Sequence, residues 1–267
     1  MPETTPEPTL DHLKRCPFCD EEIRPNALIC KHCGQWMPGF TYESAIRDLV
    51  IQKQITEVEM STIEEDVKSR DGQLKLAKQW AEGEKMISFR GFDLSAQDLE
   101  GIDLSGADLR EANLREANLT GANLSKANFI KANLFRANLK GAKIRNSDFS
   151  DAYMREIILE QADLSGSRLP RTNLRSAYMD HAVLYRVDLE RANLKTVDLR
   201  FANLRESYLK ETNFEGAKLE EINLKGALLI RTNFSSADIE PHEYQDARQI
   251  ESIILPNGQS YNLVEES

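Results

Sequence analysis

The residues of this chain whose types and spacing could support chemistry are its four cysteines, which all lie in one short segment. Cys16 and Cys19 form one Cys-X-X-Cys pair, and Cys30 and Cys33 form a second pair after ten intervening residues. Two such pairs can bring four thiolates to tetrahedral distance, which is the ligand set of a structural Zn²⁺ site. Because four thiolates fill the coordination shell, no position remains for a water, and the pattern disfavours a catalytic zinc.

The residues around the cysteines favour the same interpretation. The letters CPFC and CKHCG resemble the knuckles of zinc ribbons, and Gly34 permits the tight turn that lets backbone amides approach sulfur. A disulfide pair would need an oxidising compartment that nothing in the sequence indicates, and a redox dithiol would explain only one of the two pairs. His32 is interpreted as a surface residue, because the four cysteines already complete the shell. We therefore predict a zinc ribbon whose metal holds a small fold together.

Nucleic-acid binding by this ribbon is a weaker hypothesis. A phosphate-binding surface normally has an excess of positive charge. Here the charges cancel, with Lys14, Arg15, Arg24 and Lys31 balanced by Asp11, Asp20, Glu21 and Glu22. Phe18 and Trp36 are therefore interpreted as packing residues, and protein contact or a purely structural use is favoured.

The remaining chemistry-bearing residues do not form an enzyme motif. The four histidines, His12, His32, His181 and His242, belong to no nucleophile or general-base motif, and the chain has no phosphate-cradling glycine loop. Acidic residues are spread over interchangeable positions and form no tuned pair. We therefore expect a protein that is not an enzyme.

The larger part of the chain is a repeat with a period of five. From Leu94 to Ile239 every fifth residue is large and apolar, which makes thirty positions without a slip. A small residue usually stands two places before each of these centres, and Asn or Asp usually stands one place before. A period of five fits neither a helix nor a flat strand, so the chain must turn after each short extended piece. An Asn or Asp side chain can support such a turn by bonding its own backbone.

The exceptions to the repeat predict how many pieces make one coil. Phe149 follows Phe129 by four pentapeptides, and Phe234 follows Phe214 by the same interval. Stacked substitutions should recur at the coil length, so we predict four pentapeptides, or twenty residues, per coil. Thirty pentapeptides then give 7.5 coils. At about 4.8 Å between hydrogen-bonded strands, the column would be about 36 Å long.

At this point the repeat can be compared with a known family. The run ADLRE, ANLRE, ANLTG, ANLSK and ANFIK resembles the pentapeptide-repeat proteins over about 150 of the 267 residues. The resemblance implies a mainly β fold, a right-handed four-sided parallel β-helix solenoid. It says little about function, because one fold serves many functions.

The full domain prediction places the solenoid after a small ribbon and an α-helical connector. We expect a disordered lead at 1–10, the zinc ribbon at 11–40, a helical connector and N-terminal cap at 41–88, the β-helix at 89–241 and a C-terminal capping segment at 242–267.

Both ends of the solenoid need covers, because an end coil exposes apolar side chains and unpaired edge groups. Asp71 and Gly72 suggest a break in the connector, after which a second helix at about Gln73 to Lys85 could cover the first coil. Coiled-coil pairing of the connector is a weak hypothesis, because polar residues break its heptads. At the far end, Pro256-Asn257-Gly258 between two apolar runs predicts a hairpin.

Charges and apolar residues on the outer surface suggest where a partner could bind. One side bears nine acidic and three basic residues, a net charge of −6: Asp98, Glu100, Glu160, Asp180, Asp198, Glu220, Glu221, Asp238 and Glu240 against Lys140, Arg200 and Lys218. Another side carries a basic row, Arg115, Arg155, Arg175 and Lys195, which Phe135 interrupts. Tyr208, Leu228 and Ile230 could form a partner or self-association patch, unless the tail covers them.

Some members of the family resemble DNA in shape and charge and act on type II topoisomerases, which makes the acidic side of interest. The solenoid as a whole is nearly neutral, however, with 22 basic and 23 acidic residues in 89–241. A solvated charged face is therefore the favoured interpretation, and a DNA-mimicking regulator of a topoisomerase remains the alternative.

The sequence thus predicts a non-enzymatic scaffold that presents one side of the β-helix to a protein partner, with the zinc ribbon as a second contact module. Self-association into a homo-oligomer is a secondary hypothesis, and nucleic acid is a disfavoured partner. We expect a cytoplasmic protein without a membrane span, because no apolar run is long enough and the acidic start MPETTPEPTL does not resemble a signal peptide.

Overall fold

The structure is a computed structural model that describes residues 14–15, 22–23, 66–83 and 88–262. The predictions for the lead, the four cysteines and the first connector helix lie outside these residues. The chain divides into two units, 1–62 and 63–267. In the first unit, β1 (Lys14–Arg15) pairs antiparallel with β2 (Glu22–Ile23).

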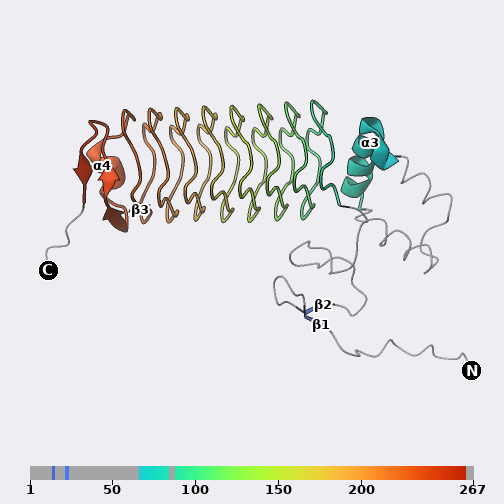
Figure 1. Cartoon of the computed structure of the whole chain (residues 1–267), viewed down its shortest axis with the longest axis horizontal. Coiled ribbons are helices and arrows are strands. Elements are labelled where there is room, and N and C mark those ends of the chain that lie inside the picture. The colour runs from blue at the N-terminus through green and yellow to red at the C-terminus, as the bar shows by residue number, and fades with distance from the viewer. Residues whose placement is uncertain (1–13, 16–21, 24–65, 84–87, 263–267) are drawn as a thin grey trace, which may run out of the picture. The chain divides into compact units, whose positions relative to one another are not determined.

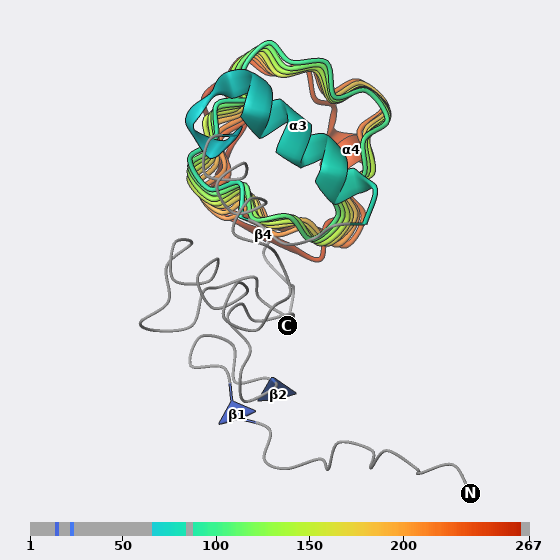
Figure 2. The same ribbon diagram turned by 90° about the vertical axis from the view of Figure 1, so that its right-hand side faces the viewer.

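The second unit is a column of stacked coils (Figure 1). Parallel bridges join each coil to the next at a spacing of four pentapeptides, from Asp93 with Asn113 to Lys218 with Asp238. Seen along its axis, the coils superpose on a four-sided outline (Figure 2). We number the faces from their first centres, so that face 1 begins at Leu94, face 2 at Leu99, face 3 at Leu104 and face 4 at Leu109.

All thirty centres point into the column. None is more than 6% exposed, and the 6% belongs to Ile239 at the C-terminal end. The Phe129 and Phe149 rings stack at 4.5 Å between centroids with an interplanar angle of 3°. The inward-facing repeat and the coil of four pentapeptides are therefore confirmed, and both follow from the burial of one large apolar side chain per side of each coil.

Each corner is a tight turn with a left-handed residue. In one such turn, Ala107 N donates to Leu104 O at 3.0 Å, and Gly106 has a φ of +72°. The Asp103 carboxylate accepts from Ser105 N at 2.8 Å, which is the role predicted for the Asn and Asp positions. From residue 96 to residue 236, the residue two places after each centre has a positive φ, whether or not it is glycine. The surrounding hydrogen bonds must hold these residues in place, because the left-handed region is unfavourable for other residue types.

Buried hydroxyl groups inside the column donate to backbone carbonyls of the preceding coil or, at Thr172 and Ser207, of their own coil. Ser147 Oγ donates to Leu124 O, and Thr232 Oγ1 donates to Leu209 O, both at 2.8 Å. Ser and Thr therefore replace the usual Ala at these positions without leaving an unpaired polar group in the core.

Helix α3 (Arg70–Ala81) covers the first coil and lies across its open end (Figure 2). Its buried face includes Leu76, Ala77 and Trp80, and the Trp80 ring meets the Phe89 ring at 5.1 Å, edge to face. The backbone N of Asp93 donates to the side-chain oxygen of Gln73 at 2.7 Å. The helix thus satisfies both needs of an end coil, which are cover for apolar side chains and partners for free backbone groups.

The predicted break lies at Ser69, between the helical residues 66–68 and α3, and not at Asp71 and Gly72, which lie in the first turn of α3. The helix begins after Ser69, whose hydroxyl caps it by accepting from Gly72 N at 3.0 Å. Gly72 is needed for close packing and not for a break, since a Cβ there would collide with the backbone of Asp66.

At the other end, the tail continues the column. Strand β3 (Leu228–Ile230) pairs in parallel with β4 (Gln249–Glu251), and β5 (Ile253–Ile254) pairs antiparallel with β6 (Ser260–Tyr261) in the expected hairpin. The short helix α4 (Pro241–Tyr244) replaces a corner.

This extra coil seals the C-terminal end. Asn233 bridges Ile254, one position further along the chain than the regular spacing would give, because α4 adds one residue to the coil. Ile250 and Ile253 point inward and are 5% and 0% exposed. Tyr208 and Leu228 remain half-buried on face 4, next to β4. Among the described residues, no helix has the length and apolar character to cross a membrane.

Candidate interaction surface

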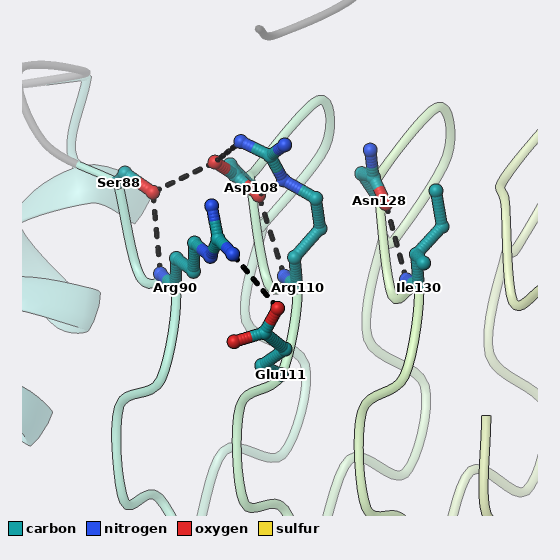
Figure 3. A network of polar contacts seen from close by, with 7 residues as sticks. All are labelled: Ser88, Arg90, Asp108, Arg110, Glu111, Asn128 and Ile130. Atoms are coloured by element: carbon teal, nitrogen blue, oxygen red, sulfur yellow. Dashed lines mark hydrogen bonds and ion pairs between the residues drawn. The ribbon is translucent and has the colours of Figure 1, made fainter. Parts of the chain in front are cut away.

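The first coil carries a serine next to a carboxylate, a combination that could in principle activate a nucleophile. Ser88 Oγ donates to Asp108 Oδ2 at 2.8 Å, and Arg110 donates to both Asp108 oxygens at 2.7 Å (Figure 3). The network contains no histidine, and Arg110 occupies the carboxylate that a serine nucleophile would need as its base. Together with the Arg90 to Glu111 ion pair at 2.8 Å, the network joins residues 88–90 to the coil that follows them. Its role is structural.

Charged side chains on successive coils pair with one another along the column. These pairs join equivalent positions of neighbouring coils: Arg136 with Glu156, Lys140 with Glu160, Asp151 with Arg171, Arg186 with Glu206, Arg191 with Glu211 and Lys195 with Glu215. On the acidic face 2, Lys140 neutralises Glu160 at 2.7 Å, and Arg200 holds Asp198 at 2.8 Å. The acidic side is therefore less uniform than its net charge suggests.

The ion pairs shift the pKa values of their members. The hydrogen bond from Arg136 lowers the pKa of the Glu156 carboxyl, and the same bond raises the pKa of Arg136. The hydrogen bond from Arg171 likewise lowers the pKa of Asp151. These shifts keep the carboxylates ionised, so none of them resembles the raised pKa of a catalytic acid.

Aromatic and arginine side chains gather where faces 1 and 2 meet. We call this set the aromatic–arginine patch: Arg115, Phe135, Arg136, Tyr153, Arg155 and Tyr178. Tyr153 is 41% exposed and Tyr178 is 50% exposed, both large values for rings on a folded protein. The Phe135 and Tyr153 rings stack at 6.0 Å.

The arginines of the patch are held in place. The guanidinium groups of Arg115 and Arg136 lie 5.2 and 4.9 Å from the Phe135 ring centre. Glu156 accepts from Arg136 at 2.7 Å and from Arg155 at 3.0 Å. Cation–π and ionic contacts therefore fix the positions of these arginine side chains.

The sequence contains the signals for this patch, but on separate rows. Phe135 interrupts the basic row of face 1, and Tyr153 interrupts its asparagine row. The coil length places these two interruptions on adjacent coils of one face, where their rings meet. Tyr178 lies on face 2, where it bridges Ile158.

A second exposed ring lies at the corner between faces 2 and 3. Phe201 is 46% exposed and has a φ of +59°. Exposure of a large apolar ring and a left-handed backbone at a residue with a Cβ are both unfavourable. Its ring stacks on His181 at 4.9 Å, and the His181 Nδ1 atom lies 2.8 Å from Asp180 Oδ2. This pair is smaller than the aromatic–arginine patch.

Of the other predicted site residues, Cys16, Cys19, Cys30 and Cys33 lie outside the described residues. Within the described part of the chain, His, Cys, Asp and Glu side chains form no cluster suited to a metal ion.

The fold and the surface together define a β-solenoid with an exposed aromatic–arginine patch. A family model described as pentapeptide repeats matches eight copies, over residues 87–125, 112–151, 157–195, 171–210, 192–229 and 207–240. The chain belongs to the pentapeptide-repeat family.

Solved structures of this fold resemble the chain. HetL from the cyanobacterium Nostoc sp. strain PCC 7120, a pentapeptide repeat protein involved in heterocyst differentiation regulation, is 26% identical, with a TM-score of 0.51 over 65% of this chain and 87% of HetL. Rfr23 from the cyanobacterium Cyanothece 51142 is 24% identical, with a TM-score of 0.27 over 58% of this chain and 93% of Rfr23. QnrB1, a plasmid-mediated fluoroquinolone resistance protein, is 16% identical, with a TM-score of 0.34 over 64% of this chain and 92% of QnrB1. A search among curated proteins found no match.

Proposed function

We propose that this protein is a non-enzymatic scaffold that presents the outer surface of its coils to a protein partner. The observation that carries the proposal is the aromatic–arginine patch. Tyrosine and arginine are enriched among the residues that dominate binding energy at protein interfaces. Tyr153 and Tyr178 are exposed, and Arg136 is already fixed by Glu156 at 2.7 Å, so little side-chain freedom would be lost on binding.

The backbone beneath the patch supports the same proposal. Tyr153 N donates to Ala132 O at 2.9 Å, and Leu134 N donates to Tyr153 O at 2.8 Å. The tyrosine is therefore hydrogen-bonded to the preceding coil through both of its backbone groups, and the surface is rigid. HetL, whose coils are similar, is involved in regulation, which agrees with a role in protein contacts.

The test is partner identification with matched variants. The full chain, a Tyr153→Ser/Tyr178→Ser variant and a Tyr208→Ser control on face 4 would each be cross-linked in cells, and the captured proteins quantified by mass spectrometry. We expect at least one partner to be lost from the patch variant and retained by the control. Equal capture by all three proteins would contradict the proposal.

We also propose that Cys16, Cys19, Cys30 and Cys33 bind one structural Zn²⁺ in a ribbon that acts as a second contact module. The antiparallel pairing of Arg15 with Glu22 supports this, because these two residues flank the first cysteine pair in the sequence. Metal analysis of the purified chain should give about one zinc per chain. A Cys16→Ser/Cys33→Ser variant should lose the metal and keep the circular dichroism of the coils. A metal-free wild-type protein prepared without chelators would refute the site.

The alternative functions are weaker. A DNA-mimicking regulator of a type II topoisomerase would need a continuous acidic face, whereas ion pairs to Lys140 and Arg200 interrupt face 2. Unchanged supercoiling by purified gyrase at micromolar protein would remove this alternative. If DNA and RNA columns do not retain the protein at any salt concentration, the hypothesis that the ribbon binds nucleic acid is excluded. A right-handed winding, which rests on the family resemblance, and a cytoplasmic location are further proposals.

A further inference from the structure

We propose that face 1 binds an acidic polypeptide segment that also carries aromatic or aliphatic residues. This inference rests on the proposed scaffold function and names the chemistry of its partner. It is carried by the arrangement of charge and aromatic rings on face 1, between the second and sixth coils.

The binding surface is a band of two neighbouring rows on face 1, which we call the basic band. One row is Arg115, Phe135, Arg155, Arg175 and Lys195, and the other is Asn113, Asn133, Tyr153, Asn173 and Asn193. Successive members of a row are about 4.8 Å apart, so the band is about 19 Å long. Its ten positions include four cations and no carboxylate.

The cations of the band are accessible to a ligand. Arg175 is exposed and, within the described residues, has no carboxylate partner. Arg115 and Lys195 pair with Glu116 at 3.0 Å and Glu215 at 2.6 Å, but their side chains remain 52% and 37% exposed. Exposed ion pairs contribute little to stability, so a ligand carboxylate can replace Glu116 or Glu215 with little loss.

The aromatic residues favour a polypeptide over a single-stranded nucleic acid. Binding of bases without sequence preference uses aromatic rings with a free face. The Phe135 ring is already stacked on Tyr153 at 6.0 Å, and the Arg115 and Arg136 guanidinium groups lie over it at 5.2 and 4.9 Å. Its faces are therefore occupied by the protein. Tyr153, which is 41% exposed, remains available for contact with an apolar side chain of the polypeptide.

The experiment uses a defined probe, a fluorescein-labelled random copolymer of glutamate and tyrosine, with polyglutamate and an oligothymidylate as competitors. Binding to the full chain would be followed by fluorescence anisotropy at low and physiological salt. The test variants are Arg175→Glu and Tyr153→Ser. The control is Arg205→Glu, which makes the same charge change at the same pentapeptide position on the opposite face 3. Circular dichroism would check that each variant keeps its coils.

We expect the copolymer to bind, Arg175→Glu to weaken binding by at least about tenfold, and Arg205→Glu to change it by less than about twofold. Tyr153→Ser should weaken binding of the copolymer. It should leave binding of polyglutamate unchanged, which we expect to be weaker than binding of the copolymer. Equal binding by all variants would overturn the inference. Tighter binding of the oligothymidylate than of the copolymer would assign the basic band to nucleic acid. A dimer in analytical ultracentrifugation that Arg175→Glu abolishes would assign the basic band to a second copy of this chain. Either result would also overturn the inference.

The same experiments separate this inference from the proposed scaffold function. A cellular partner that depends on Tyr153 and Tyr178, together with no copolymer binding, would refute the acidic ligand and leave the scaffold function standing. Copolymer binding without any patch-dependent partner in cells would refute the scaffold function.

Discussion

Two corners of the first coil allow a direct test of the left-handed turns. Ala96 and Gly106 follow Leu94 and Leu104 by two residues, and their φ angles are +53° and +72°. Ala96 is exposed, and a Cβ added to Gly106 would meet no atom within 4 Å. Exchanging alanine and glycine at either corner therefore changes the backbone preference and almost no packing.

The expected magnitude follows from two opposing effects. The left-handed conformation is unfavourable for a residue with a Cβ by about 1–2 kcal/mol. Glycine, in turn, gains about 0.4–1 kcal/mol of conformational freedom in the unfolded chain. The difference is about 0.5–1 kcal/mol. Ala96→Gly should raise the free energy of unfolding by this amount, and Gly106→Ala should lower it by this amount.

The assay is urea unfolding followed by far-ultraviolet circular dichroism, with the midpoints compared at unchanged slope. Gly166→Ala is a useful third variant, because its Cβ would also approach Asn146 Oδ1 at 2.5 Å. It should therefore lower the midpoint more than Gly106→Ala does. If Ala96→Gly destabilises the protein, or if both exchanges shift the midpoint in the same direction, the proposed role of φ at the corners is wrong.

Three further experiments test the core and the surface charges. Leu164 is fully buried, so Leu164→Ala should lower the free energy of unfolding by about 2–5 kcal/mol in the same urea assay, and a loss below about 1 kcal/mol would contradict the packing. A double-mutant cycle of Phe129→Leu and Phe149→Leu should give a coupling of about 0.5–1.5 kcal/mol from their stacked rings, whereas strictly additive effects would argue against the stack. The hydrogen bond from Arg200 lowers the pKa of Asp198 from its ordinary value of 3.8. The ionised Asp198 therefore stabilises the folded protein at pH values above 3.8, and this stabilisation is lost as the pH falls through the lowered pKa of the folded state. Asp198→Asn should therefore reduce the acid-dependent part of the stability below about pH 4, and an unchanged pH profile would refute this assignment.

The coil is predictable from the sequence because burial acts on every repeat in the same way. One apolar side chain of each pentapeptide must be buried inside the column. The five-residue spacing of apolar residues therefore stays visible in the sequence whatever occupies the other four positions. Phe129 and Phe149 reveal the coil length for the same reason. The sign of φ at the corners leaves no such signal, because residues as different as Ala96, Gly106 and Phe201 occupy the same position.

The surface and the ends are less predictable. The patch depends on side chains from different rows, and an inspection of single rows separates Phe135 from Tyr153. The tail loses the period of five where α4 adds a residue, so its continuation of the column is not visible in the sequence. Gly72 is a weak helix former and therefore suggests a break, although tight packing on Asp66 explains it.

The regular spacing of the bridges has a consequence for how such proteins can change in length. Duplicating or deleting one whole turn between Leu114 and Phe214 would leave every remaining hydrogen bond with an equivalent partner, whereas a change by part of a turn would break the match between neighbouring coils. The columns of related proteins should therefore differ in length by increments of about 4.8 Å, so that the distance between the two capped ends would change in evolution only by whole coils.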